Sequence, residues 1–193
     1  MRECIREIEA FYEADGPYAV SEEQARFILE EAIDRATEYT YASIALKSLE
    51  ARSLGEQKGA ASLENPQVGS HVAYLTRRLV ASPDGQVAKC NRGLAAMAIS
   101  TDQNGFDKVI GSSLLVRVTG RGRRDDQHTV VSAVHELGHT FRLPHCPQAN
   151  PVCAMRASSR LGVSGQDSLS AFCYSCTADF RGLTNQYLSH SIS

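Results

Sequence analysis

His135-Glu136-Leu137-Gly138-His139 lies two-thirds of the way along the 193-residue chain, and His145 follows six residues after the second histidine. Two histidines four residues apart lie one above the other on the same face of a helix. Neutral imidazoles suit zinc, and three protein ligands leave a fourth coordination position open for water. Glu136 directly follows the first candidate ligand, where its carboxylate could accept a proton from that water. The stretch therefore predicts metal-assisted hydrolysis.

The residues around this stretch favour a helix that ends where the chain must turn. We expect Asp125 or Asp126 to cap its start. Pro144 disfavours helical conformation at the residue before it, so the helix should end there and bring His145 back to the metal. The plainer alternative is a helix with two surface histidines, which the third histidine disfavours. Apolar residues recur at spacings of three and four and indicate a buried stripe: Val130, Val131, Val134, Leu137 and Phe141.

Length and composition predict one domain, or one domain with a small lobe, and 42% hydrophobic residues are enough for a core. A net charge of −2 gives no reason to expect nucleic acid or a membrane surface as a partner. Residues 1–16 are rich in Glu and Arg, so we expect no signal peptide. No run of 18 apolar residues exists, so we expect no transmembrane helix. The expected compartment is cytoplasmic and reducing.

In a reducing compartment, clustered cysteines indicate a metal site. Cys173 and Cys176 form a C-x-x-C pair, the usual half-site for tetrahedral zinc. Cys146 and Cys153 precede that pair by fewer than thirty residues, which favours a site with four cysteine ligands. The alternatives are a set of buried reduced thiols, or one or two disulfides.

With both clusters in view, the pattern resembles that of the archaemetzincins, a branch of the metzincin metallopeptidases. Their signature is a zinc helix with a distal third histidine, a cysteine beside that histidine, then C-x-M, seventeen residues and C-x-x-C. Cys153-Ala154-Met155 fits C-x-M here, and residues 156–172 supply the seventeen-residue spacing before Cys173. The match covers residues 135–176, about a fifth of the chain.

The resemblance implies a role for each of these residues. Glu136 would be the general base, and Met155 would be the Met-turn residue that packs beneath the metal. It also implies two Zn²⁺ ions per chain. The catalytic ion would be bound by His135, His139 and His145, and the structural ion by Cys146, Cys153, Cys173 and Cys176.

The chain departs from the pattern at Arg142. Metzincins usually carry glycine three residues after the second histidine, where the chain leaves the helix and often needs a positive φ. Either the turn has a different shape here, or surrounding contacts hold Arg142 in a strained conformation. Its side chain would reach solvent, or else present a cation near the active cleft.

Outside the matched region the pattern predicts short elements. Ser21-Glu22-Glu23-Gln24 resembles a capping box that starts a helix running to about Glu38. An earlier helix is expected over residues 5–12, a loop over 55–70 and a turn over 82–85. Residues 94–100 and 114–119 should be strands, and residues 178–188 a terminal helix. Cys4 and Cys90 are interpreted as ordinary core or semi-exposed thiols. The remaining histidines are interpreted as surface or structural, and His128 could also contact a metal ligand from behind: His71, His128 and His190.

Together these expectations give an α/β fold of the metzincin type. A twisted mixed sheet with helices would occupy residues 1–143, ending in the zinc helix, and a small zinc-stabilised lobe would occupy residues 144–193. The expected function is a zinc metallopeptidase, either an aminopeptidase or an endopeptidase. Its peptide substrate would lie along the cleft between the two parts and pair with an edge strand. The alternatives are a zinc-stabilised peptide-binding protein with little or no hydrolysis, and hydrolysis of a non-peptide amide.

Overall fold

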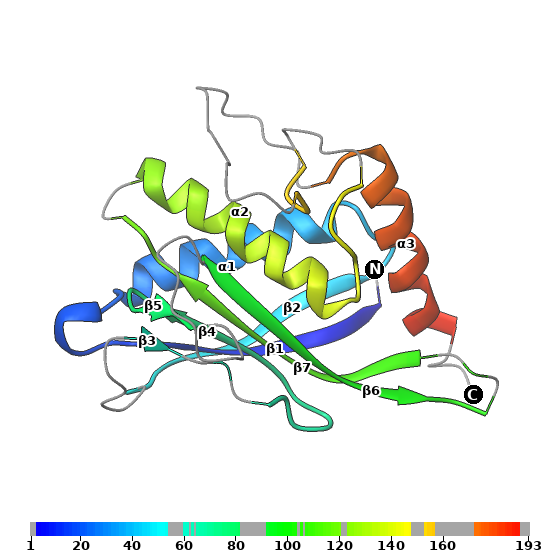
Figure 1. Ribbon diagram of the computed structural model, residues 1–193, viewed down its shortest axis with the longest axis horizontal. Coiled ribbons are helices and arrows are strands. Elements are labelled where there is room, and N and C mark those ends of the chain that lie inside the picture. The colour runs from blue at the N-terminus through cyan, green and yellow to red at the C-terminus, as the bar shows by residue number, and fades with distance from the viewer. Residues whose placement is uncertain are drawn as a thin grey trace.

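A five-stranded mixed sheet with helices against one face forms the body of the protein (Figure 1). The computed structural model describes residues 3–53, 60–61, 63, 65–81, 92–103, 105, 107–120, 123–147, 153–156 and 172–189. The strands are β1 (Cys4–Tyr12), β2 (Ser43–Ala51), β3 (Ala60–Ala61), β4 (His71–Thr76), β5 (Leu79–Val80), β6 (Gly93–Thr101) and β7 (Asp107–Arg117). The helices are the 3₁₀ turn Gly16–Tyr18, α1 (Glu22–Thr37), α2 (Arg123–Thr140) and α3 (Tyr174–Ser189).

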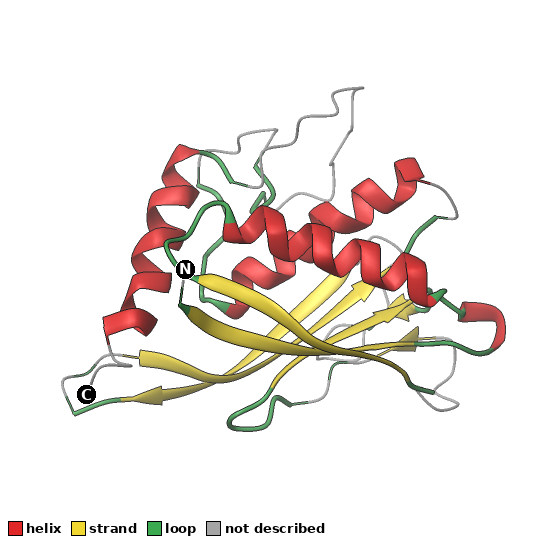
Figure 2. Ribbon diagram, turned by 180° about the vertical axis from the view of Figure 1, so that it is seen from behind, coloured by secondary structure: helices red, strands yellow, loops and turns green. Residues whose placement is uncertain are grey.

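The strand order in the main sheet is β2-β1-β4-β7-β6. The first four of these strands are parallel, whereas β6 pairs antiparallel with β7 and ends the described sheet. A second, two-stranded sheet pairs β3 with β5. Helices α1 and α2 lie side by side on one face of the main sheet, and α3 stands at one end of it (Figure 2). This arrangement places α2, which carries the first two candidate ligands, beside the antiparallel strand β6.

The expected helix over residues 5–12 is wrong, because this segment is the central strand β1. Its buried side chains alternate at a period of two, with Arg6, Ile8 and Ala10 facing the helix layer. The apolar residues at positions 5, 8, 11 and 12 also fit a helical spacing, which is why the sequence pattern predicted a helix. Strands β2 and β4 were not expected either. Both pair with β1 in parallel, so each depends on partners distant in sequence.

Other expectations are confirmed. The hydroxyl of Ser21 accepts a hydrogen bond from the backbone N–H of Gln24 and caps α1, which ends at Thr37. The two predicted strands are β6 and β7, with β7 beginning earlier than expected, and the terminal helix is α3. The expected caps of α2 are wrong, because that helix already begins at Arg123. The expected turn over residues 82–85, and much of the expected loop over 55–70, lie outside the described residues.

The helix layer and the sheet enclose a continuous hydrophobic core. The core includes Val130, Val131, Val134 and Leu137 from α2 and Phe141 directly after it, as the apolar spacing predicted. Among the described residues, no helix is both long and apolar enough to cross a bilayer.

Candidate metal centre

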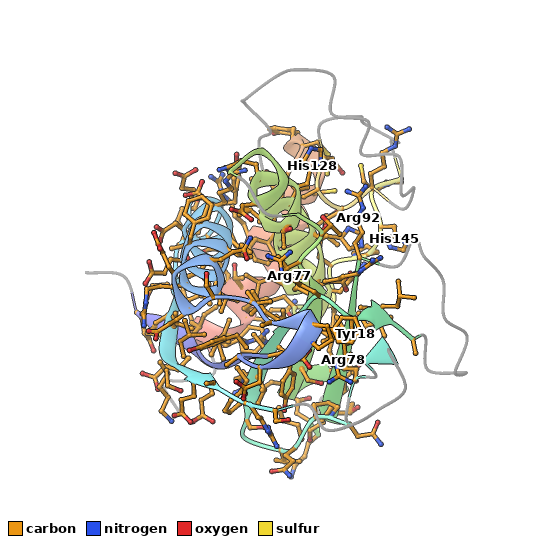
Figure 3. The ribbon with its side chains drawn as sticks, turned by 90° about the vertical axis from the view of Figure 1, so that its left-hand side faces the viewer. Tyr18, Arg77, Arg78, Arg92, His128 and His145 are labelled. Carbon is orange, nitrogen blue, oxygen red and sulfur yellow. The ribbon has the colours of Figure 1, made fainter. Side chains whose placement is uncertain are left out.

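Three histidine side chains converge at the carboxyl-terminal half of α2. His135 and His139 come from consecutive turns of the helix, and His145 comes from the segment that follows it. One ring nitrogen from each lies within 4.8 Å of the others. The ring centroids are 4.5 Å apart for His135 and His139, 5.3 Å for His135 and His145, and 4.7 Å for His139 and His145. His145 lies on the side of α2 away from α1 (Figure 3).

Backbone carbonyls orient the two helical imidazoles. His135 Nδ1 lies 2.7 Å from the carbonyl oxygen of Ala154, and His139 Nδ1 lies 2.9 Å from that of Leu143. A carbonyl only accepts, so each Nδ1 carries the hydrogen and donates it. Burial lowers the pKa of His135 to about 4 and also lowers the pKa of His139, so both rings are neutral at pH 7.

The two Nε2 atoms therefore present lone pairs. They lie 3.0 Å apart. In a neutral ring with its hydrogen on Nδ1, the Nε2 atom carries no hydrogen. Neither Nε2 atom can therefore donate to the other, and at this separation the two lone pairs repel each other. A cation between the nitrogens relieves that repulsion. Ligands at about 2.05 Å from a tetrahedral zinc are about 3.3 Å apart, close to the separation seen here.

Glu136 points from α2 toward strand β6. Its side chain is 7% exposed and packs directly over the backbone of Gly93, the first residue of that strand. A Cβ at Gly93 would lie 2.5 Å from Glu136 Cγ and 2.7 Å from Oε1, so glycine is required for this approach. Burial raises the pKa of Glu136 to about 8. The carboxyl group is therefore protonated more readily than that of an exposed glutamate.

The end of α2 is a Schellman motif with Arg142 in the left-handed position. The N–H of Leu143 donates to the carbonyl of Gly138 at 3.1 Å, and the N–H of Arg142 donates to that of His139 at 2.8 Å. Arg142 has a φ of 68° and is the only residue other than glycine with positive φ in the described chain.

Of the two expectations for this turn, the strained conformation is confirmed. The side chain of Arg142 is exposed, as expected of a side chain that reaches solvent. It pairs with the carboxylate of Asp107 at 3.0 Å, at the start of β7. The turn therefore keeps its usual shape without the usual glycine.

Met155 packs against α2 at Gly138, the residue before His139. It is fully buried, and a Cβ on Gly138 would lie 2.6 Å from its Sδ atom, so the helix backbone and the sulfur are in close contact. The backbone carbonyl of Met155 accepts the N–H of Cys146 at 2.7 Å. Its neighbour Ala154 holds the ring of His135. The short segment Cys153–Met155 thus contacts both α2 and the ring of His135.

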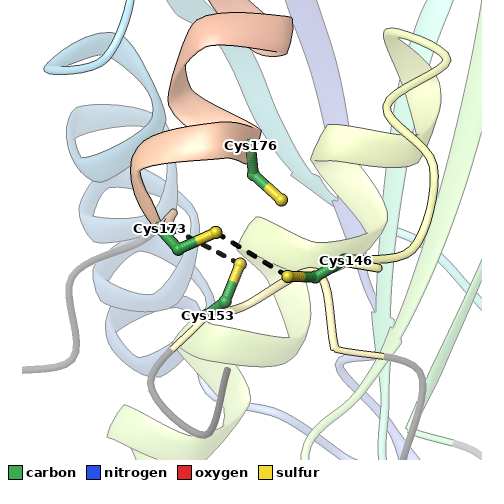
Figure 4. Close-up of side chains that lie close together, drawn as sticks. All are labelled: Cys146, Cys153, Cys173 and Cys176. Atoms are coloured by element: carbon green, nitrogen blue, oxygen red, sulfur yellow. Dashed lines mark hydrogen bonds between the residues drawn. The ribbon is translucent and has the colours of Figure 1, made fainter. Parts of the chain in front are cut away.

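Four cysteines form a second cluster (Figure 4). One sulfur from each lies within 4.8 Å of the others, and all four side chains are buried: Cys146, Cys153, Cys173 and Cys176. The sulfur atoms of Cys146 and Cys173 are 3.7 Å apart, well beyond the bond length of a disulfide, which is about 2.05 Å. All four are free thiols, so the alternative of disulfides among them is wrong.

The sulfur geometry fits a tetrahedral metal. Four thiolates at about 2.3 Å from zinc are about 3.8 Å from one another. Burial raises the pKa of Cys153 to about 11 and raises that of Cys176 as well, so without a cation these groups stay protonated. A bound divalent cation reverses that preference and holds the thiolates. Both clusters therefore have the donor set and the spacing of a zinc site.

The two clusters are joined through the backbone. His145 belongs to the first and the next residue, Cys146, to the second. Cys153 likewise belongs to the second cluster, while Ala154 orients a histidine of the first. A displacement of the cysteine cluster would therefore move both His145 and Ala154.

The other candidates lie elsewhere. His71 donates to or accepts from Ser112 Oγ at 2.9 Å beneath the helix layer, and Cys4 is an exposed free thiol. His71 fits the structural role expected of it, whereas Cys4 is more exposed than the core or semi-exposed thiol that was expected. His128 lies near the amino end of α2, two turns before the first ligand, and belongs to neither cluster. Cys90 and His190 lie outside the described residues.

Sequence reasoning missed two residues of this region. Gly93 contacts the candidate base from a strand 43 positions away, and nothing in its own neighbourhood marks it. Arg6 contacts the last turn of α2 from β1. A charged residue among apolar ones in a presumed helix would be placed in solvent, so only a correct assignment of β1 could have located it.

No family model matches the chain, and no curated protein matches it. Several solved structures do match the chain. An archaemetzincin from Methanopyrus kandleri aligns with a TM-score of 0.59 at 19% identity, covering 96% of this chain and 97% of its own. A zinc-dependent peptidase from Methanocorpusculum labreanum aligns with a TM-score of 0.51 at 15% identity, over 90% of this chain and 100% of its own.

An archaemetzincin from Archaeoglobus fulgidus, complexed with malonate, aligns with a TM-score of 0.51 at 16% identity. It covers 89% of this chain and 98% of its own. These matches cover 89% to 96% of the chain, far beyond the stretch of residues 135–176 that suggested the resemblance. The chain therefore has the metzincin-like fold of the archaemetzincins, with a triad of histidines and a cluster of four cysteines as its two candidate metal sites.

Proposed function

We propose that the protein is a zinc-dependent metallopeptidase. In this proposal His135, His139 and His145 bind the catalytic zinc. The observation that carries it is the pair of neutral imidazoles whose unprotonated nitrogens face each other at 3.0 Å, with a third ring beside them. This is a poor arrangement for histidines alone and a suitable one for a shared cation. Zinc bound there would supply Lewis acidity, lowering the pKa of water and polarising a carbonyl.

Glu136 is the general base of the proposed reaction. Its carboxylate accepts the proton of the attacking water and then delivers it to the leaving amine. The close packing on Gly93 fixes the side chain between the histidines and the edge strand. A pKa raised by burial favours return of the proton, because the acid form is accessible near neutral pH.

The four cysteines would hold a second, structural zinc. We propose that this site fixes the segments on either side of it, so that Cys146 positions His145 and Cys153 positions Ala154 and Met155. Met155 acts by packing under the histidines and does not bind the metal. The division into a part ending in the zinc helix (residues 1–143) and a zinc-stabilised part (residues 144–193) is proposed on the same basis.

The proposed substrate is a peptide in extended conformation. Strand β6 ends the described sheet and pairs there only with β7, so its other edge can accept a further strand. Gly93 at the start of β6 touches the candidate base. A peptide paired with β6 would therefore run past Glu136 and the histidines. The zinc-dependent peptidase with the same fold supports a peptide as substrate.

Replacement of Glu136 by glutamine tests this function directly. The amide cannot accept the proton, so turnover of a peptide library should fall at least about a hundredfold. The histidines are untouched, so the zinc content should stay that of the wild type. If the variant cleaves peptides at the wild-type rate, Glu136 is not the general base. If the wild-type protein binds zinc and peptides but cleaves none, it is the peptide-binding alternative.

A further inference from the structure

A buried arginine contacts the end of the zinc helix. Arg6 projects from β1 and is only 3% exposed. One terminal nitrogen of its guanidinium donates to the backbone carbonyl of Thr140 at 3.0 Å and to the hydroxyl of Thr140 at 2.8 Å. The other lies 3.4 Å from the hydroxyl of Tyr187 on α3. Arg6 thus joins the first strand, the last turn of α2 and the terminal helix.

The surroundings keep this group charged without a carboxylate. The guanidinium carbon lies 3.5 Å from the centre of the Phe141 ring, a close cation–π contact. Burial lowers the pKa of Arg6 to about 10, so the side chain remains a cation at neutral pH. Among the residues that the structure describes, no acidic side chain pairs with it.

The position suits a cation for a specific reason. The last carbonyls of a helix have no partner within the helix, and the end carries partial negative charge. Thr140 is the residue after His139, and its hydroxyl also donates to the carbonyl of Leu137 at 2.7 Å. Arg6 therefore neutralises and fixes the turn that carries the second histidine.

A short path leads from this contact to the metal ligand. Beyond Thr140 the chain makes the Schellman turn, and that turn delivers the carbonyl of Leu143 to the ring of His139 at 2.9 Å. The orientation of the His139 ring depends on where that carbonyl lies. The turn is already strained at Arg142, so it needs external contacts to keep its shape.

We propose that Arg6 is a positioning residue for the metal centre, holding the end of α2 so that the Leu143 carbonyl orients the ring of His139. The inference rests on the proposed three-histidine zinc site. A role in stability alone explains the observations less well. Burying a guanidinium is costly, and its Nε atom has no hydrogen-bond partner. An apolar side chain would fill the same space without that cost.

The test measures metal affinity rather than hydrolysis. The variants are Arg6→Met, which removes the donors, Arg6→Lys, which keeps a cation, and Thr140→Val, which removes the hydroxyl. Arg78→Met is the control, because Arg78 is also poorly exposed and pairs with Glu13 near the far end of β1. Cobalt replaces zinc, and chelator competition is followed separately in the sulfur-to-cobalt charge-transfer bands and in the weaker bands of the histidine site.

We expect Arg6→Met to weaken cobalt binding at the histidine site about tenfold, a change typical of groups that orient a ligand. The cysteine site should keep its affinity. Arg6→Lys should restore most of the loss, and Thr140→Val should give a smaller loss in the same site. Arg78→Met should lower thermal stability and leave the histidine site unchanged. If Arg6→Met does not fold, the lysine and valine variants decide the question.

Two outcomes overturn the inference while leaving the proposed function intact. In one, none of the Arg6 and Thr140 variants changes affinity at the histidine site. In the other, Arg78→Met weakens that site as much as Arg6→Met, which would mean that loss of stability alone explains the effect. If the wild-type protein binds no metal through its histidines, the proposed function fails, and this inference fails with it.

Discussion

The proposed chemistry depends on the absence of a side chain at Gly93. Its backbone contacts the aliphatic part and the carboxylate of Glu136 at distances that no Cβ permits. The carboxylate is consequently held against the edge strand, where a paired peptide would pass. A single methyl group at this position therefore acts on the base without touching any metal ligand.

We predict that Gly93→Ala displaces the Glu136 side chain and lowers peptide hydrolysis at least about tenfold, because a small misplacement of a catalytic group is costly. Zinc content should not change. Steady-state kinetics and elemental analysis measure the two effects. Gly182→Ala on α3 is the control, since a Cβ there meets nothing within 4 Å, and it should be fully active. Wild-type turnover by Gly93→Ala would show that the contact is unimportant.

At this scale the sequence predicts the candidate ligands but not their supports. The spacing of His135, His139 and His145 follows from helix geometry and one turn, so it can be recognised locally. The contacts of Gly93 and Arg6 with α2 join residues 43 and 134 positions apart. No local pattern encodes such contacts, because they depend on which strand lies under the helix.

Among the elements, the segment after α2 depends most on its surroundings. Residues 143–147 contain neither helix nor strand, yet they carry His145 and Cys146. Their described anchors include the Schellman turn and the hydrogen bond from Cys146 to Met155. The cysteine cluster supplies a third anchor, and with zinc bound it becomes the strongest of them.

We therefore predict that Cys173→Ser weakens zinc binding at the histidine site about tenfold, although Cys173 contacts none of the histidines. Thermal stability should fall as well, because binding free energy at a structural zinc is also folding free energy. Chelator competition and thermal unfolding measure these changes. Cys4→Ser, which alters an exposed thiol, should change neither. Unchanged histidine-site affinity in Cys173→Ser would show that the two sites are independent.

Element prediction failed where two periods fitted the same residues. In β1 the apolar positions match a helical spacing, but the exposed Glu7 and the half-buried Glu9 alternate with the buried side chains of Arg6, Ile8 and Ala10. Only pairing with β2 and β4 decides between the two, and that information is not local. In α1, α2 and α3 the apolar stripe spans several turns, and there the pattern was sufficient.

For the whole molecule, the sequence predicted a mixed sheet with helices but not the strand order. The order places β6 beside α2 and at the end of the sheet, where β7 is its one strand partner among the described residues. The expectation of a mixed sheet with helices came from the family resemblance, since only two of the five strands were assigned from their own residues. The structural matches over about nine-tenths of the chain or more confirm it.

His71 links global stability to pH. Burial, together with the nearby Arg6 cation, lowers the pKa of its imidazole from 6.5 to about 4. Below pH 6.5 the unfolded chain takes up a proton that the folded protein does not, so stability is lost as the pH falls from about 6.5 to 4. Because the ring keeps some contact with solvent, we expect a contribution on the order of 1 kcal/mol.

The prediction is that His71→Asn has a shallower fall of unfolding free energy between pH 6.5 and 4 than the wild type. Denaturant unfolding across this range measures it. Acid loss of metal affects both proteins alike, so only the difference between their curves is interpreted. Parallel curves would show that His71 is protonated as readily in the folded protein as in the unfolded chain.

We propose that the histidine triad and the cysteine cluster each hold one zinc ion. Elemental analysis of the purified wild-type protein and of His139→Ala tests it most directly. We predict two zinc ions per chain in the wild type and one in the variant, because removing one imidazole empties the histidine site and leaves the cysteines intact. One zinc or none in the wild type, or two in His139→Ala, would contradict the claim.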